Sequence, residues 1–148
     1  MRMKSLVLLS AFAVALTACA VPNPVRDPRE RGPFVPQSQM PLMPNIARAA
    51  PSEGCQGEPL QALHAPLPEY PRRGWSRGEH AWSIVQFDVA GAGSVENVRI
   101  AEGVPGRYFD AESVRAVRQW QFAPLSEGAH LTGCTVMFEF VLGRVRIR

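Results

Sequence analysis

The sequence predicts a small α+β domain in which a three-stranded antiparallel sheet is covered on one face by a single helix. Residues 82–89 alternate between apolar and polar side chains, as a half-buried strand does. Two further strands are predicted over 95–100 and 131–142, the last rich in Thr, Val and Phe. A helical pattern lies between them, with Val114 and Val117 on one face. The order β-β-α-β gives a two-layer core.

The first two strands are expected to form a hairpin. An extended, proline-rich stretch over 66–71 and a short helical turn over 72–77 precede them. The glycines of residues 91–93 tolerate positive φ and so favour a tight turn between the strands. One face of the first strand carries Ser83, Val85, Phe87 and Val89.

The helix is predicted to begin at Asp110 and to end near Gln119 or Trp120. An Asp is a favourable N-cap, and Glu112 in the first turn suits the helix dipole. Pro124 ends this part of the chain. In the last strand, Cys134, Val136, Phe138 and Phe140 share one face.

The N-terminus is typical of an exported lipoprotein. Two positive charges in residues 1–4 precede an apolar run over 6–16, which is too short to span a membrane. The run ends in Leu-Thr-Ala-Cys, which resembles the bacterial lipobox. We therefore expect residues 1–18 to be removed as a signal peptide and Cys19 to be lipidated. The alternative is an ordinary secretory signal cut beside Ala18 or Ala20.

A proline-rich segment separates the lipid site from the domain. It extends over 19–59 and contains nine prolines. Because proline lacks an amide donor and fixes φ, neither a helix nor a central strand is expected there. The segment is predicted to be a tether, and residues 60–148 to be the folded domain.

Charge argues against a nucleic-acid partner. The whole chain has a formal charge of +3, and loss of Arg2 and Lys4 with the signal peptide leaves +1.

Two cysteines remain besides Cys19. In an oxidising compartment Cys55 and Cys134 are expected to form a disulfide, which closes a loop of about 80 residues and contributes on the order of 4 kcal/mol. Two free thiols or a metal site are the alternatives.

The sequence shows no enzyme motif. It lacks a Gly-x-Ser-x-Gly, P-loop or zinc-binding pattern, and CxxC and HxxxH spacings are absent. A Cys–His nucleophile would need a free Cys55 or Cys134 beside His64, His80 or His130, and a disulfide removes it. We expect no catalytic residues, no metal and no cofactor.

Residues 66–142 resemble the C-terminal domain of the TonB family. The resemblance depends on several short motifs in the family's order, none of them diagnostic alone. They are Pro68-Glu69-Tyr70-Pro71, Phe87-Asp88-Val89, Gly93-Ser94-Val95, Phe109-Asp110, Trp120-Gln121-Phe122-Ala123-Pro124 and Phe138-Glu139-Phe140. One departure is that TonB proper has an uncleaved transmembrane helix with a Ser/His pattern, whereas residues 5–18 here contain no histidine. Proton-motive coupling is therefore not carried over.

The resemblance implies a protein that binds and does not catalyse. Family domains add an extended peptide, the TonB box of an outer-membrane transporter, to a sheet edge, where main-chain hydrogen bonds give affinity. The matching element here is the last strand, and pairing of that strand in a homodimer, or core packing alone, are the alternatives. The expected contact residues are Thr132, Thr135, Val136, Met137, Phe138 and Glu139.

The tail alternates arginine with Val and Ile. Its arginines Arg144, Arg146 and Arg148 are candidates for contact with an anion such as a lipid phosphate, or else are solvated residues of a continuing strand.

Two functions follow from the sequence. The first is a periplasm-facing binding module in envelope transport whose partner is an outer-membrane transporter or another envelope protein. The second is a structural or assembly lipoprotein that has the fold but no role in energy transduction. Because Ala20 and not Asp follows Cys19, the outer membrane is favoured over the inner.

Overall fold

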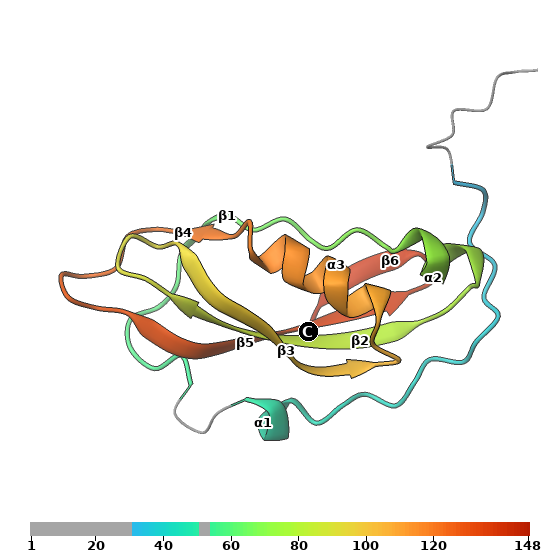
Figure 1. Ribbon diagram of the computed structural model, residues 1–148, viewed down its shortest axis with the longest axis horizontal. Coiled ribbons are helices and arrows are strands. Elements are labelled where there is room, and N and C mark those ends of the chain that lie inside the picture. The colour runs from blue at the N-terminus through green and yellow to red at the C-terminus, as the bar shows by residue number, and fades with distance from the viewer. Residues whose placement is uncertain (1–30, 51–53) are drawn as a thin grey trace, which may run out of the picture. The chain divides into compact units, whose positions relative to one another are not determined.

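The computed structural model describes residues 31–50 and 54–148 (Figure 1). The compact unit within it runs from Pro33 to Arg148. The predicted signal peptide and Cys19 lie outside the described residues. In the described part of the chain, no helix is long and apolar enough to cross a membrane.

The fold is α+β, as predicted, but the main sheet has four strands and not three. The strands are β2 (Ala81–Val89), β3 (Val95–Val104), β5 (Leu131–Val141) and β6 (Arg144–Ile147). Their order is β3-β2-β5-β6, and all neighbours are antiparallel. A second sheet pairs β1 (Ala62–His64) with β4 (Gln121–Phe122).

The fourth strand is the arginine tail. The chain reverses after Val141 through Leu142 and Gly143, which have φ values of 48° and 73°. Two consecutive residues with positive φ are typical of the tight hairpin turns that match strand twist. The tail therefore does not continue β5 but folds back beside it.

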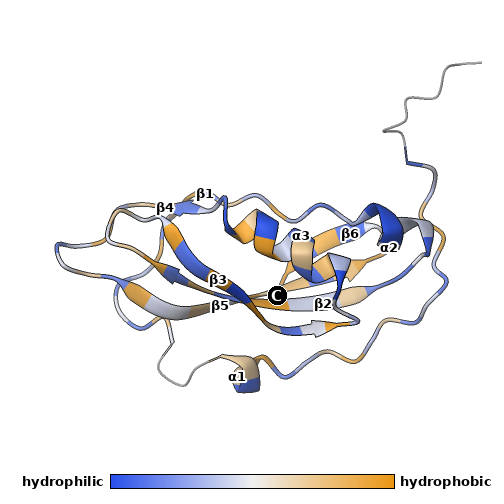
Figure 2. Ribbon diagram, in the orientation of Figure 1, coloured by the Kyte–Doolittle hydropathy of each residue, from blue (hydrophilic) through white to orange (hydrophobic). Residues whose placement is uncertain are grey.

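One face of the sheet carries the main core. Helix α3 (Tyr108–Val117) lies across it, and the short helix α2 (Arg72–Ser76) covers its end. Phe109 and Val117 of α3 are fully buried against Val85, Phe138 and Phe140 of the strands. Figure 2 shows apolar residues in α3 and in the strands beneath it.

The start of α3 differs from the prediction. The helix begins at Tyr108, after Arg107 with a φ of 63°, and no side chain caps it. Asp110 lies in the first turn, where its Oδ1 accepts a hydrogen bond of 3.1 Å from the Ser83 hydroxyl. The carboxyl therefore ties the helix to β2 instead of capping it. The helix also ends at Val117, earlier than expected.

The opposite face of the sheet is covered by part of the predicted tether. We call residues 33–50 the strap, which contains the one-turn helix α1 (Ile46–Ala49). Met40 and Ala49 of the strap pack against Trp82, Ile84 and Met137 of the sheet. In Figure 1 the strap follows the side of the sheet away from α3. The folded unit thus begins at Pro33, well before the predicted boundary at residue 60.

Hydrogen bonds hold the strap along its length. The Trp82 indole N–H donates to Pro41 O over 2.9 Å, and the Gln86 side chain donates to Ala49 O. Near the start of the strap, Gln37 N–H donates to Gly78 O over 3.0 Å. A proline-rich chain cannot join a central strand, but its free carbonyls can accept bonds from side chains of the sheet.

We predict that replacing Gly78 loosens the strap. Gly78 has a φ of 55°, and an added Cβ would lie 1.9 Å from Val35 O. Gly78→Ala is expected to lower the free energy of unfolding by about 2–3 kcal/mol and to speed cleavage of the strap by proteases. Urea denaturation and limited proteolysis measure the two effects.

The matched control for this change is Gly128→Ala. Gly128 has a φ of 75°, and nothing lies within 4 Å of its added Cβ, so this variant reports the backbone cost alone, about 1 kcal/mol. Equal decreases in the free energy of unfolding in the two variants would show that the contact with the strap does not restrict residue 78.

Candidate functional site

The predicted docking strand, β5, is not an edge of the sheet along its whole length. Strand β6 pairs with it from Phe138 to Val141. The expected binding edge is therefore not a free edge at Phe138 and Glu139, because the tail pairs with them, and peptide contact at these two residues stays a prediction.

A short part of that side of β5 remains open. The Cys55 N–H donates to Thr132 O over 2.7 Å, and the Arg148 N–H donates to Met137 O over 2.9 Å. Between these bonds, Thr135 and Val136 have no strand partner on this side among residues 31–50 and 54–148. Of the predicted contact residues, Val136, Met137 and Phe138 have side chains buried in the core, and Glu139 is buried too.

The disulfide fixes one end of this open stretch. Cys55 and Cys134 are bonded, with their Cα atoms 4.3 Å apart, which confirms the predicted pair. Cys134 lies opposite Phe87 of β2 and is buried. The bond holds the chain beside Thr132, and it leaves neither thiol free to act as a nucleophile.

Asp88 stabilises the irregular start of β5. Its Oδ1 accepts a 2.7 Å bond from the Gly133 N–H, and its Oδ2 accepts a 2.7 Å bond from the Asn97 side chain. Burial alone would raise the pKa of Asp88, but the Gly133 and Asn97 bonds outweigh it and lower the pKa below its ordinary value. The charged carboxylate thus links three segments at this point.

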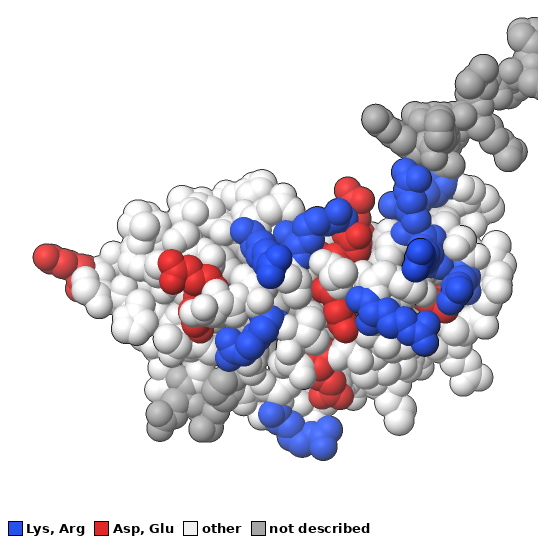
Figure 3. All heavy atoms as spheres, viewed as in Figure 1, with Lys and Arg blue, Asp and Glu red and all other residues white. Residues whose placement is uncertain are grey.

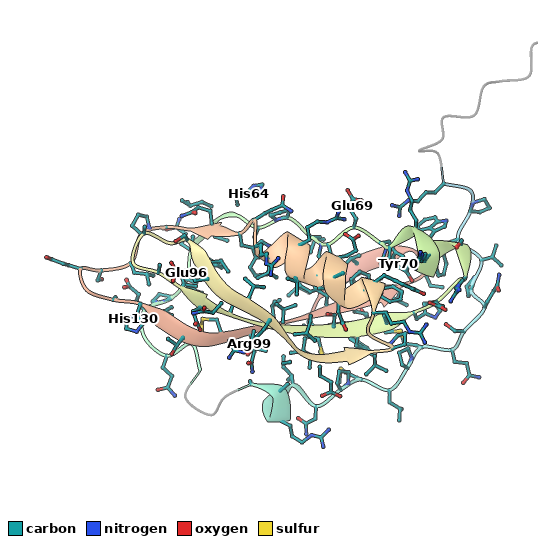
Figure 4. The ribbon with its side chains drawn as sticks, viewed as in Figure 1. His64, Glu69, Tyr70, Glu96, Arg99 and His130 are labelled. Atoms are coloured by element: carbon teal, nitrogen blue, oxygen red, sulfur yellow. A yellow bond between two sulfur atoms is a disulfide. The ribbon has the colours of Figure 1, made fainter. Side chains whose placement is uncertain are left out.

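The other outer strand, β3, is poorly suited to pairing. It carries exposed Glu96 and Arg99, and its register with β2 shifts twice. Asn97 has a φ of 50°. Charged side chains and bulges are the means by which native proteins protect sheet edges from unwanted pairing. Figure 4 labels Glu96 and Arg99 on this strand.

A shallow groove of about 580 Å³ runs between β3 and α3. Its lining is Ile100, Asp110, Ala111, Val114, Arg115, Arg118 and Gln119. Burial raises the pKa of Asp110, and the bond from Ser83 opposes this. No cluster of titratable groups that would serve acid–base chemistry accompanies the Asp110 carboxyl in this lining.

The arginine tail is partly used within the fold. Glu139 is buried, and its Oε2 lies 2.8 Å from Arg148 Nη2 and 3.0 Å from Arg148 Nε. This two-point contact satisfies the carboxylate. Arg144 and Arg146 are exposed and line a groove of about 370 Å³ with Glu139, Val141 and Leu142. Of the three predicted anion contacts, Arg144 and Arg146 are the ones available.

The histidines do not form a cluster. His64 and His130 are exposed and lie apart in Figure 4. His80 is buried beneath the strap, and its Nδ1 donates to Ser38 O over 3.0 Å. No group of three or more His, Cys, Asp or Glu residues in the described part of the chain is placed to hold a metal ion.

An aromatic cluster closes the end of the sheet that bears α2. The Phe34 ring lies 5.4 Å from both Tyr70 and Trp75, and Tyr70 also contacts Phe109 and Phe140. Burial, followed by the nearby charge of Glu79, raises the pKa of Tyr70 well above its ordinary value. The Tyr70 hydroxyl donates to the backbone carbonyl of Glu79. Tyr70, part of the predicted Pro-x-Tyr-Pro motif, therefore has a structural role.

The β5–β6 hairpin and the covered second face of the sheet were not predicted, although the sequence carries signals for both. The Leu142-Gly143 pair and the regular Arg-Val-Arg-Ile alternation indicate a hairpin. The large apolar side chains of Trp82 and Ile84, on the face of β2 assumed to be outer, indicate a second covered face.

Comparison with known proteins gives one family. Residues 66–142 match the family described as Gram-negative bacterial TonB protein C-terminal. Protein TonB of Pseudomonas aeruginosa is 30% identical over 98 residues, which cover 65% of this chain and 29% of that protein. Protein TonB of Salmonella typhimurium is 33% identical over 107 residues, which cover 70% and 43%. The chain thus spans less than half the length of these relatives.

A solved structure shares this similarity. The solution NMR structure of the Pseudomonas aeruginosa TonB CTD is 30% identical, with a TM-score of 0.49, and the match covers 59% of this chain and 90% of that one.

Proposed function

This chain belongs to the family of Gram-negative bacterial TonB protein C-terminal domains, and on that premise we propose that it is a non-enzymatic, periplasm-facing binding module of envelope transport. It docks an extended segment of an outer-membrane transporter or another envelope protein by strand addition. The observation that carries the proposal is a sheet whose strand β5 has no strand partner at Thr135 and Val136, on the side away from β2, among the described residues. This stretch lies between the Cys55 bond to Thr132 and the four-residue strand β6.

The geometry favours β5 over β3 as the docking strand. The bulges and charges of β3 oppose a regular ladder along it. In contrast, β5 pairs with β2 in register from Cys134 to Phe140. A peptide that reaches Thr135 therefore meets a regular strand, and it extends along that strand as far as β6 allows.

Strand β6 competes with the partner for the same backbone groups. Its four residue pairs cover β5 from Phe138 to Val141, and three of its four residues are exposed. Docking of more than a few residues needs β6 to leave. Only molecules in which β6 is released then bind the longer peptide. The apparent Kd is therefore the intrinsic Kd divided by the fraction of such molecules.

The proposal includes a lipid anchor at Cys19. The apolar run over 6–16 and the Leu-Thr-Ala-Cys sequence support it. Diacylglycerol and a further acyl chain hold a protein on a membrane stably, whereas one chain does not. The module then acts from the periplasmic side of one membrane, with the outer membrane favoured by Ala20. The predicted homodimer stays a prediction.

We predict that removal of β6 strengthens peptide binding. Residues 20–148 contain the whole folded unit and are titrated with a labelled synthetic peptide of TonB-box type, followed by fluorescence anisotropy. Truncation after Leu142 is expected to lower Kd about tenfold, because the competing strand is gone. Thr135→Pro is expected to raise Kd at least tenfold, because proline offers no amide to the peptide.

The control for truncation is Arg144→Gln with Arg146→Gln, which removes the charges but keeps the strand. It is expected to change Kd less than twofold. A truncated protein that stays folded by circular dichroism and binds no better contradicts docking on β5. Absence of saturable binding to any of these forms favours the structural or assembly role.

A further inference from the structure

The chain enters the folded unit at one end of the sheet. Phe34, the second residue of the unit, lies between α2 and the β5–β6 turn. Its ring is 5.4 Å from that of Trp75, and a Cβ added to Gly143 would lie 2.7 Å from the Trp75 ring and 3.2 Å from Phe34. The start of the strap, α2 and the turn at Leu142 and Gly143 are therefore in contact.

This packing brings two arginine clusters that are far apart in the sequence to the same end of the sheet. Arg72 and Arg73 are exposed on α2, and Arg77 follows it. Arg144 and Arg146 are exposed beside the turn that Trp75 covers. Figure 3 shows basic side chains at the end of the molecule that bears α2, and others spread over the rest of this face. Arg144 and Arg146 lie opposite Val141 and Glu139, on the face of the sheet away from α2, so the two clusters flank the turn from its two faces.

Two acidic groups near these clusters, Glu79 and Glu139, are engaged within the fold, whereas Glu69, three residues before Arg72, is exposed. Glu79 lies 3.7 Å from Arg77 and accepts a hydrogen bond from the Tyr108 hydroxyl. Glu139 is buried and paired with Arg148. Leu142, at the tip of the turn, is 59% exposed. The end therefore presents an apolar tip surrounded by arginines, a combination suited to the interface of an anionic membrane.

Because the strap belongs to the folded unit, the proposed tether from Cys19 is short. Only thirteen residues, 20–32, separate Cys19 from the folded unit. Fully extended, they span at most about 50 Å, whereas a tether up to residue 59 would span roughly 140 Å. With Cys19 lipidated, this shorter connection limits how far the folded unit can lie from the lipid surface.

We propose that the end formed by α2 and the β5–β6 turn is a docking surface for the anionic lipids of the membrane that carries Cys19. Arg72, Arg73, Arg144 and Arg146 contact lipid phosphates, and Leu142 enters the interface between headgroups and acyl chains. The proposal depends on the lipid anchor of the proposed function.

The test is co-sedimentation of residues 20–148, which lack the lipid cysteine, with vesicles of phosphatidylcholine containing 30% phosphatidylglycerol. Binding is expected, and it should weaken with salt and be absent from vesicles of phosphatidylcholine alone. Arg144→Gln with Arg146→Gln is expected to weaken it roughly 25-fold, since each basic residue near an anionic surface contributes a factor of about five.

The matched control is Arg48→Gln with Arg118→Gln, which removes the same charge from α1 and from the end of α3. It is expected to change vesicle binding less than twofold. Equal losses in the two double variants, or no binding to anionic vesicles, overturn the proposal. Peptide titration of the same proteins tests the proposed function separately, so saturable peptide binding without vesicle binding contradicts the membrane surface alone.

Discussion

The structure depends on covering both faces of one sheet. Strand β2 directs Val85 and Phe87 toward α3, and it directs Trp82 and Ile84 to the other side. A single helix covers only the first face. Left open, the second would expose Trp82, Ile84 and Met137 as an apolar surface, which soluble monomers generally avoid. The strap, which belongs to the same chain, covers these side chains.

Covering the second face has a consequence for the tether. A segment that packs on the sheet cannot also serve as a tether, so the proposed lipid anchor at Cys19 would leave the folded unit a shorter reach from the membrane. Strand β6 is a similar case, because a segment that seems a loose basic tail covers backbone groups of β5. In both cases a piece of chain occupies a surface that a partner would otherwise reach. The domain is thereby protected from unspecific pairing, and access to β5 depends on how readily β6 leaves.

The sequence predicted the parts of the fold that follow from local periodicity. The three long strands, the helix over 110–117 and the disulfide were all expected from alternation, helical spacing and compartment. The strap was missed because proline-rich chains lack any periodic signal, and the contacts that hold it, such as Trp82 to Pro41, span about forty residues. The edge at β5 was misjudged because a tail was assumed to continue a strand. Bringing Arg72 and Arg144 to the same end of the sheet needs the contact of Trp75 with the β5–β6 turn, which no spacing reveals.

Hydrogen–deuterium exchange on residues 20–148, with and without the TonB-box-type peptide, tests the central claim most directly. Docking on β5 in place of β6 predicts that peptide binding slows exchange at Thr135 and speeds it over Arg144–Ile147, while Val95–Val104 is unchanged. Slower exchange over Val95–Val104, with β6 as protected as before, would contradict the account and place the partner on β3.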